Sequence, residues 1–359
     1  MATMKIPSTM RSWQYRSTKG GLESNLTLSI VPVPQPTADQ HVVRIIAAAV
    51  NPVDYRLAEF QLLHRLTFPK PVSPGNDFAG YIVKPAPGSA LKPGQLVFGG
   101  AGTNFMCGGS RVLLNGGSGG VGAFGIQIAK AEGRHVTVTC STANVKLCKS
   151  LGADEVIDYK VQNVLQTLKA SPQKYDLVVD NVGNDQNLYW KAHEYMNPGA
   201  KFVTVAVSHQ FSFIRFAATA QLLPSLLSGA TRQHLIVFGN GNAEDLRKIA
   251  DWIVEGKIKA VIDSKYNLEE LRQAYQRLKT GRARGKIIVN VGQWRSVPLE
   301  RMASAMNPIE HPHGLAGFTA VDRPATYSML LSGITLRDPL ALSYFGNLRR
   351  VLSSTMINK

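Results

Sequence analysis

One stretch of the chain, residues 111–122, constrains the fold more than any other. It reads Arg-Val-Leu-Leu-Asn-Gly-Gly-Ser-Gly-Gly-Val-Gly, an apolar run followed by glycines at G-x-G-x-x-G spacing. The apolar run is typical of a buried parallel strand, and residues 123–131 carry a helical apolar stripe. A strand, a glycine turn and a helix form a phosphate site, because glycine lets backbone N–H groups approach a pyrophosphate beside the positive helix N-terminus. A glycine-rich surface turn is the weaker alternative. The predicted dinucleotide contacts are Gly117, Ser118, Gly119, Gly120, Val121 and Gly122.

The next predicted strand, residues 135–139, indicates which dinucleotide binds. About 20 residues past the glycines, NAD-binding chains place Asp or Glu on the ribose 2′-hydroxyl. Here Ser141 and Thr142 stand instead, with Lys146 shortly after. Hydroxyl groups and a nearby cation suit a 2′-phosphate, and no carboxylate repels it. The pattern favours NADPH over NADH, and a solvated helix position is the alternative for Lys146.

The rest of the middle of the chain alternates between strand and helix patterns, which predicts a parallel, doubly wound α/β sheet. Asn181 and Val205 come at the carboxyl ends of two of these strands, where such sheets bind ligands. A capping box at residues 267–270 opens the last predicted helix. The predicted strands are residues 156–157, 176–179, 201–207, 235–238 and 286–291, and the predicted helices are residues 161–170, 188–196, 244–254 and 271–278.

The N-terminal part has a different pattern, dominated by strands and turns. Residues 1–10 are expected to be a loose tail. A β-rich part followed by an α/β part indicates two domains, for which 359 residues are sufficient. Alternating or strongly apolar runs predict strands at residues 26–31, 41–50, 81–83 and 95–98.

The composition limits the partners of the chain. It has 40 Lys and Arg against 24 Asp and Glu, a net charge of +16, and a basic surface attracts nucleotides, lipids and nucleic acids without discrimination. There are no RNP aromatics, helix-turn-helix pattern or long basic run, so we expect no dedicated nucleic-acid partner. The three cysteines have no paired spacing. Without a membrane-length apolar run or a signal region, we expect no membrane partner and a cytoplasmic protein.

Five separated motifs make residues 11–291 resemble the zinc-independent quinone oxidoreductase and enoyl reductase branch of the medium-chain dehydrogenase/reductase superfamily. Details within these motifs look most like fungal members tied to secondary metabolism. The resemblance implies a GroES-like catalytic lobe, a Rossmann NADPH-binding domain and a final return to the catalytic lobe, and it leaves homodimerisation open. It also implies that Tyr159 contacts the 2′-phosphate. The motifs are residues 51–54, 74–80, 116–122, 150–159 and 281–289, and the implied divisions are residues 11–110, 111–263 and 264–291.

The resemblance also implies that no zinc is bound. Zinc members of the superfamily would have Cys at the position of Asn51 and a His-Glu pair at residues 76–77. Asn is a poor zinc ligand compared with thiolate or imidazole, and the sequence has no other Cys/His cluster. The four-cysteine structural zinc loop is missing as well.

The activity implied by the resemblance is hydride transfer from NADPH to a quinone or to the β-carbon of an α,β-unsaturated carbonyl compound. The cofactor carries the chemistry, while the protein orients it and stabilises the developing oxyanion. Without a metal, hydrogen-bond donors must do this. Asn51 and Tyr55 are the nearest candidates, with Tyr55 either a proton donor or a packing and substrate-contacting residue. Asp54 is expected to be an orienting carboxylate rather than a general base.

Two departures from the family pattern affect this expectation. Residues 99–110 replace a longer family segment that includes one wall of the nicotinamide site, so the catalytic lobe is expected to be internally shortened. Residues 292–359 form an extension beyond the family's closing strand, with breakers such as Asn307-Pro308 and modest elements only at residues 327–336 and 340–351. An inactive, cofactor-binding relative is therefore the second interpretation, and a basic protein with incidental RNA affinity is the third.

Overall fold

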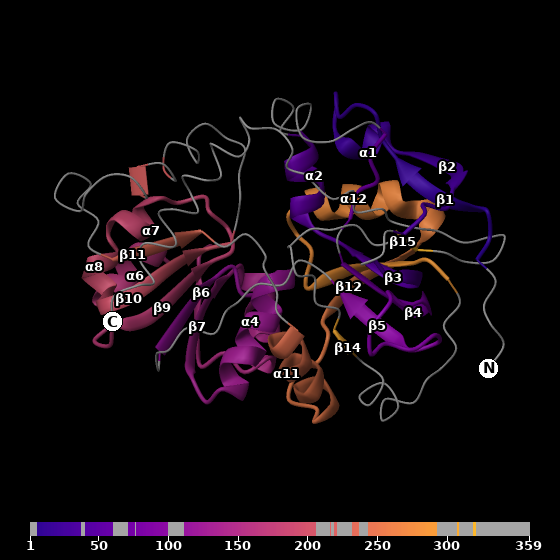
Figure 1. Cartoon of the computed structure of the whole chain (residues 1–359). Helices are drawn as coiled ribbons and strands as arrows, with labels where there is room; N and C mark the ends of the chain where they lie inside the picture. The colour runs from indigo at the N-terminus through magenta and orange to yellow at the C-terminus, as the bar shows by residue number, and fades with distance from the viewer. Residues whose placement is uncertain are drawn as a thin grey trace.

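The chain folds into two lobes, which lie side by side in Figure 1. The described residues between 111 and 254 form one lobe, and those of the N-terminal part together with residues 262–290 form the other. Figure 1 shows this return of the chain, because the orange elements lie among the indigo ones. The computed structural model describes residues 6–36, 40–59, 71–75, 77–99, 111–205, 216, 219–220, 232–236, 243–292, 307–308 and 319–320.

The first lobe contains a six-stranded sheet in which every neighbouring pair is parallel. Its order is β11-β10-β9-β6-β7-β8, so the strand order reverses between β6 and β9. A doubly wound sheet binds ligands at that reversal, beyond the carboxyl ends of the strands. The predicted Rossmann fold is confirmed. The strands are β6 (Arg111–Asn115), β7 (His135–Cys140), β8 (Glu155–Asp158), β9 (Tyr175–Asp180), β10 (Met196–Thr204) and β11 (Gln233–Ile236).

The helices of this lobe agree with the sequence patterns at most positions. Helix α6 begins at Val164, three residues later than predicted, because the Asn163 side chain caps it by accepting a hydrogen bond from the Gln166 N–H. The single helix predicted at residues 188–196 is wrong: the chain forms two short helices, and Met196 already pairs with β9. The helices are α4 (Gly120–Ala131), α5 (Val145–Ser150), α6 (Val164–Ala170), α7 (Asn187–Trp190), α8 (Ala192–Tyr195) and α11 (Ala243–Val254).

The second lobe is built on a mainly antiparallel sheet of order β12-β13-β3-β4-β5-β14. Strand β15 joins it by pairing with β3, and β1 and β2 form a separate hairpin-like pair. The strands are β1 (Thr9–Gln14), β2 (Thr27–Pro32), β3 (Val42–Val50), β4 (Asp77–Lys84), β5 (Leu96–Gly99), β12 (Ile262–Asn267), β13 (Lys286–Asn290), β14 (Asn307–Pro308) and β15 (Thr319–Ala320).

Two short pieces of the C-terminal extension take part in this sheet. Asn307-Pro308 was expected to be a chain breaker, but it pairs in parallel with β5 at Val97 and Phe98. This edge position suits Pro, because the edge of a sheet tolerates a residue without an N–H donor. The elements predicted at residues 327–336 and 340–351 lie outside the described residues.

The core of the second lobe joins residues that are far apart in the sequence. Helix α12 (Leu271–Lys279) buries Leu271, Ala274 and Tyr275 against side chains of β3 and β13. The predicted capping box is present, with Asn267 and Glu270 bonding reciprocally at the start of this helical segment. Helices α1 (Leu22–Asn25) and α2 (Pro52–Glu59) complete the lobe.

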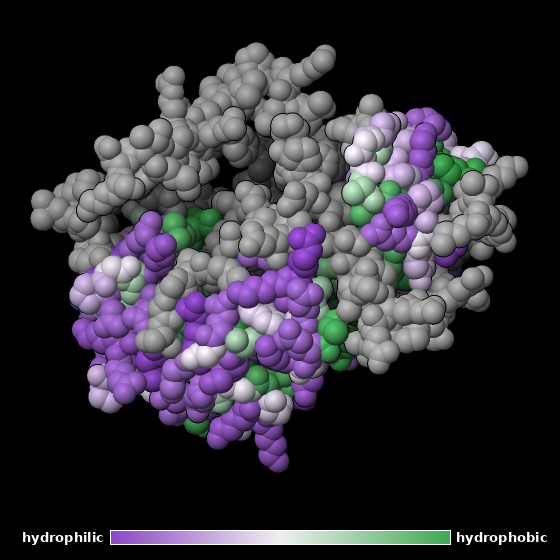
Figure 2. Space-filling model, turned by 60° about the horizontal axis from the view of Figure 1, so that its bottom comes forward, coloured by the Kyte–Doolittle hydropathy of each residue, from purple (hydrophilic) through white to green (hydrophobic). Residues whose placement is uncertain are grey.

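The surface in Figure 2 is hydrophilic over most of the described residues in that view, with hydrophobic residues in small groups between them. Among the residues that the structure describes, no helix is long and apolar enough to cross a membrane.

Candidate active site

The glycine turn lies at the carboxyl end of β6, where the sheet order reverses. At Gly122 an added Cβ would lie 2.1 Å from the Gly116 carbonyl oxygen, and at Gly117 it would lie 2.8 Å from the Val138 side chain. Gly119 is different, since the nearest atom to a Cβ there is 4.0 Å away and its backbone is extended. The first and third glycines therefore allow close packing of the turn, and the second leaves free space next to the α4 N-terminus. This arrangement leaves room for a pyrophosphate, and its predicted role in binding one stays a prediction.

A buried polar network under the turn fixes its shape. The Thr139 hydroxyl donates to the Asn115 side chain at 2.6 Å and accepts from the Gly116 N–H at 2.9 Å. The Asn115 amide donates to the Asp180 carboxylate at 2.8 Å, and that carboxylate also accepts from the N–H groups of Val182 and Gly183. These contacts tie the ends of β6, β7 and β9 together. The sequence analysis did not find these residues, because only their pairing across three strands reveals the role.

Asn144 links the glycine turn to the predicted 2′-phosphate residues. Its amide donates to the Ser118 hydroxyl at 3.0 Å and to the Ser141 hydroxyl at 3.2 Å. Each hydroxyl accepts from Asn144 and so keeps its own proton available for an anion. Asn144 was missed in the sequence, although it follows Ser141 by three residues in the same turn.

The remaining predicted cofactor residues lie near this turn and differ in their exposure to solvent. Thr142 and Lys146 are exposed in the segment after β7. Tyr159 is 51% exposed and its N–H donates to the Cys140 carbonyl, which brings it next to Ser141. The Val205 N–H donates to the Asp180 carbonyl at the end of β9. The chain thus brings these residues to one edge of the sheet, and their contacts with a cofactor remain predictions.

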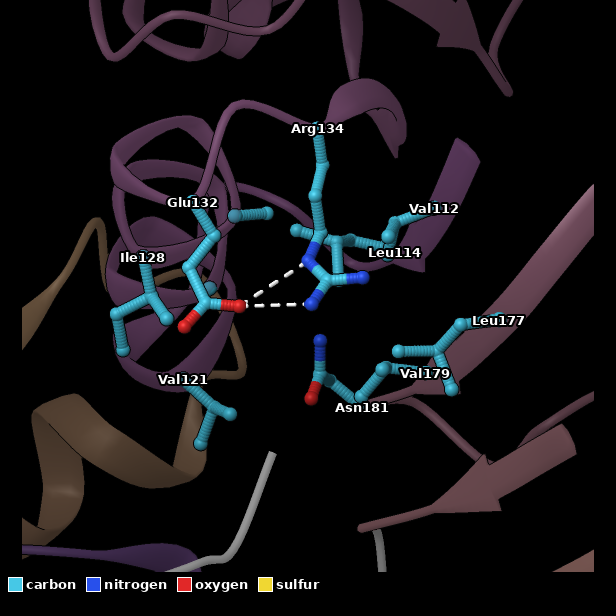
Figure 3. A pocket seen from close by; sticks show the side chains of 11 residues that line it. Val112, Leu114, Val121, Ile128, Glu132, Arg134, Leu177, Val179 and Asn181 are labelled. Atoms are coloured by element: carbon cyan, nitrogen blue, oxygen red, sulfur yellow. Dashed lines mark hydrogen bonds and ion pairs between the residues drawn. The ribbon is translucent and has the colours of Figure 1, made fainter. Parts of the chain in front are cut away.

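Asn181 also lies beside the turn, with its Cβ 3.6 Å from the position of a Cβ on Gly116. Figure 3 shows its side chain pointing towards Arg134 in a groove between α4 and strands β6 and β9. Arg134 is held there by an ion pair with Glu132 at 2.7 Å. The Asn181 amide atoms are buried and have no hydrogen-bond partner among the described residues. Its predicted role towards the cofactor stays a prediction.

A charged cluster from the second lobe faces the turn. The Lys286 ammonium donates to the Asp77 carboxylate at 3.0 Å and to the Asn51 side-chain oxygen. The Asn51 amide donates to the same Asp77 oxygen at 2.8 Å. The Lys286 stem reaches the turn, since a Cβ on Gly120 would lie 3.1 Å from Lys286 Cδ. The Gly285 N–H donates to the Ser118 carbonyl at 3.1 Å, which fixes the two lobes to each other at this point.

Asp54 is buried behind this cluster. It accepts from the Asn51 N–H at 2.7 Å and from the Tyr275 hydroxyl at 3.3 Å. The pKa of the Asp54 carboxyl is raised to about 7, mainly by burial and also by the Asp77 charge, and this net rise remains although the Asn51 N–H, the Lys286 ammonium and the Tyr275 hydroxyl lower it. The carboxyl thus bonds the backbone just before α2, and its predicted orienting role stays a prediction.

We expect Asp54→Asn to flatten the pH dependence of stability between about pH 4 and pH 7. In that range the folded state keeps a proton on Asp54 that the unfolded state has lost. The contribution of Asp54 to the wild-type free energy of unfolding therefore falls as pH rises, by up to about 1.4 kcal/mol per pH unit. Above about pH 7 this contribution levels off. Denaturant unfolding at several pH values measures the difference. The exposed Asp251→Asn is the control. Parallel wild-type and Asp54→Asn curves would contradict this assignment.

Tyr55 lies on α2 and contacts the core of the second lobe. Its ring lies 5.1 Å from the Lys279 ammonium. Lys279 in turn pairs with Glu23 and Glu59. This environment suits packing, and the predicted proton-donor role of Tyr55 stays a prediction.

Comparison with known families covers both lobes. Residues 37–139 match the alcohol dehydrogenase GroES-like domain, and residues 151–289 match a family described as zinc-binding dehydrogenase. The trans-enoyl reductase pgmF of Aspergillus terreus is 39% identical over 349 residues, covering 80% of this chain and 98% of that protein. The chain belongs to the enoyl and quinone reductase branch of the medium-chain dehydrogenase/reductase superfamily. It is thus an oxidoreductase of a family that binds a nicotinamide cofactor.

Other members of the superfamily give the same result. A 2-methylene-furan-3-one reductase of Solanum lycopersicum is 30% identical, with 80% of this chain and 81% of that protein covered. The solved quinone oxidoreductase of Coxiella burnetii has a TM-score of 0.64 at 22% identity, covering 79% of this chain and 99% of that chain. A crotonyl-CoA carboxylase/reductase in complex with NADP has a TM-score of 0.65 at 16% identity, covering 81% and 96%. The two structures support the fold.

The family description raises the question of whether zinc fits this site. Asn51 offers only an amide, and its side-chain oxygen and the Asp77 carboxylate both accept from the Lys286 ammonium. Zinc prefers thiolate, imidazole and carboxylate ligands, and a fixed ammonium repels a second cation. No group of three or more His, Cys, Asp or Glu side chains suited to a metal occurs among the residues described. The donor set at the cluster does not fit a zinc ion.

Proposed function

We propose that the chain is a zinc-independent, NADPH-dependent reductase that transfers hydride to an α,β-unsaturated carbonyl compound or a quinone. The observation that carries the proposal is the contact between the glycine turn and the charged cluster, at Gly120 and Lys286. The proposed dinucleotide site and a polar cluster of the other lobe meet there. A reductase requires such an arrangement, because the cofactor and the groups that bind the substrate must be close together. The names of the Aspergillus and Solanum relatives, a trans-enoyl reductase and a methylene-furanone reductase, favour the unsaturated carbonyl compound.

The residues of the turn fit the cofactor. When bound, NADPH supplies the hydride. The N–H groups at the start of α4 would hold its pyrophosphate, and the Ser118 and Ser141 hydroxyls, oriented by Asn144, would donate to the 2′-phosphate. No acidic side chain follows β7 at residues 141–146, so nothing there repels that phosphate.

Turnover tests the proposal directly. NADPH fluorescence on titration measures cofactor binding, and NADPH oxidation with a model quinone and a model enone measures reduction. Binding without turnover would favour an inactive, cofactor-binding relative. No NADPH binding at all would contradict the reductase and leave the RNA-binding interpretation to be tested. A cytoplasmic location, a homodimer and a role in secondary metabolism stay predictions.

Ser141→Asp should reverse part of the cofactor preference. A carboxylate at this position repels the 2′-phosphate but not the 2′-hydroxyl of NADH, so we expect the NADPH Kd to rise roughly 10- to 100-fold and the NADH Kd to change little. Fluorescence titration of both cofactors measures the ratio. Ser150→Asp, which adds the same charge at an exposed position of α5, is the matched control. An unchanged preference in Ser141→Asp would remove Ser141 from the site.

A further inference from the structure

Lys286 is the cation nearest to the cofactor turn in the charged cluster, and sequence analysis gave it no role. Its stem lies against Gly120, and its side chain is 22% exposed. The ammonium has three N–H donors, of which Asn51 and Asp77 accept two. One N–H is thus left without an acceptor among the described residues. A fixed positive charge with a spare donor beside a dinucleotide cradle can bind an oxyanion.

The neighbouring donors are already engaged. The Asn51 amide donates to Asp77 at 2.8 Å and to the Ala49 carbonyl at 3.4 Å, so both of its hydrogens have acceptors. Asp77 can only accept. Asn51 and Asp77 therefore hold the ammonium from two sides, and the second lobe offers Lys286 as the donor at this point of contact with the turn.

We propose that the Lys286 ammonium stabilises the negative charge that develops on the carbonyl oxygen of the substrate, and that Asn51 and Asp77 position it. The proposal rests on the reductase function above. In the reduction of an enone, a C–H bond of the dihydronicotinamide breaks and its electron pair forms a C–H bond at the β-carbon. The C=C pair moves into the bond between the α-carbon and the carbonyl carbon, and the C=O pair moves onto the oxygen, where the ammonium N–H binds the resulting enolate. A proton from water then adds at the α-carbon, so the substrate is reduced by two electrons and NADPH is oxidised.

A phenol with a coloured anion tests the charge without turnover. Bound to the wild-type protein saturated with NADP⁺, para-nitrophenol should ionise more readily than in water, with its pKa lowered by about one unit, which is a tenfold change in the ratio of phenolate to phenol. Absorbance against pH measures this ratio. In Lys286→Met the lowering should disappear, and in Lys286→Arg it should largely remain because the charge remains.

Three controls separate this role from a structural one. Lys265→Met removes an exposed lysine on β12, next to β13, and should leave the probe unchanged. The double variant Asp77→Asn/Lys286→Met leaves no unpaired carboxylate, and it should lose the phenolate preference even if Lys286→Met alone is unstable. NADP⁺ titration and circular dichroism confirm that each variant is folded and loaded.

The outcomes distinguish this inference from the proposed function. Equal phenol ionisation in wild type and in the folded variants that carry Lys286→Met would overturn the inference, as would a wild type without preference for phenolate. A preference that depends on Lys286 in a protein with no enone or quinone turnover would support the oxyanion site while the reductase function fails. With turnover present, Lys286→Met should lower kcat, measured at saturating NADPH, roughly 10²- to 10³-fold.

Discussion

Gly122→Ala should strongly weaken NADPH binding and lower the thermal stability of the Rossmann lobe. The added Cβ would lie 2.1 Å from the Gly116 carbonyl oxygen and 2.7 Å from Gly117 Cα, and both are backbone atoms that cannot move aside without opening the turn. Overpacking of this kind costs about 1–3 kcal/mol, so we expect the melting temperature to fall by roughly 5 °C. The NADPH Kd should rise more than about 100-fold, because the N–H groups that cradle the phosphates move with the turn.

Gly119→Ala separates cofactor contact from folding. The nearest atom to its Cβ is 4.0 Å away, and its φ of −77° suits any residue, so the melting temperature should change by less than about 1 °C. The methyl group would nevertheless occupy the space next to the start of α4 where a pyrophosphate approaches, and the NADPH Kd should rise at least about tenfold. Unimpaired NADPH binding in both variants would show that the dinucleotide does not bind at this turn.

The fold could be predicted from the sequence where local pattern and tertiary contacts agree. The apolar run before Gly116 corresponds to β6, because buried parallel strands are nearly continuous in apolar residues, and the alternation at residues 135–139 corresponds to β7. The prediction failed at residues 188–196, where the contact of Met196 with Tyr175 on β9 ends the helix. It also failed at Asn307, since pairing of such a short segment with β5 depends on the sheet edge it meets.

The sequence predicted the glycine turn of the candidate site but not its charged cluster. Phosphate binding depends on backbone geometry that glycine spacing reveals, so the turn could be predicted. The charged cluster depends on Asn51, Asp77 and Lys286, which come together only when residues 262–290 return to the sheet of the second lobe. Asn51 was predicted to be a hydrogen-bond donor to the substrate. Its actual partners are Asp77 and Lys286, which lie 26 and 235 residues away in the sequence, so the sequence pattern around Asn51 does not reveal them. The segment Gly281–Val289 was recognised as a motif of the family, and Lys286 within it was the one feature of the sequence that could have indicated the cluster.

Restoring the shortened segment should raise reductase activity far more than cofactor affinity. Strand β5 ends at Gly99 and β6 begins at Arg111, so the proposed gap falls between the lobes in sequence. The alignment with the Aspergillus relative spans 349 positions, whereas 80% of this 359-residue chain is about 287, so part of the relative has no counterpart in this chain. The predicted phosphate contacts all follow Arg111 and are retained. The predicted nicotinamide wall belongs to the missing segment.

The experiment compares the chain as it stands with a version that carries the relative's segment between Gly99 and Arg111. Hydride transfer needs the reacting atoms at about 3–3.5 Å, and a displacement of about 1 Å can cost 10²-fold in rate. We therefore expect enone or quinone reduction to rise at least about 100-fold on restoration, with the NADPH Kd changed less than about threefold. A Gly/Ser insertion of equal length is the matched control, and it should not restore the rate, because length alone supplies no wall against the nicotinamide. Equal rates in the chain as it stands and in the restored version would show that other residues already form that wall.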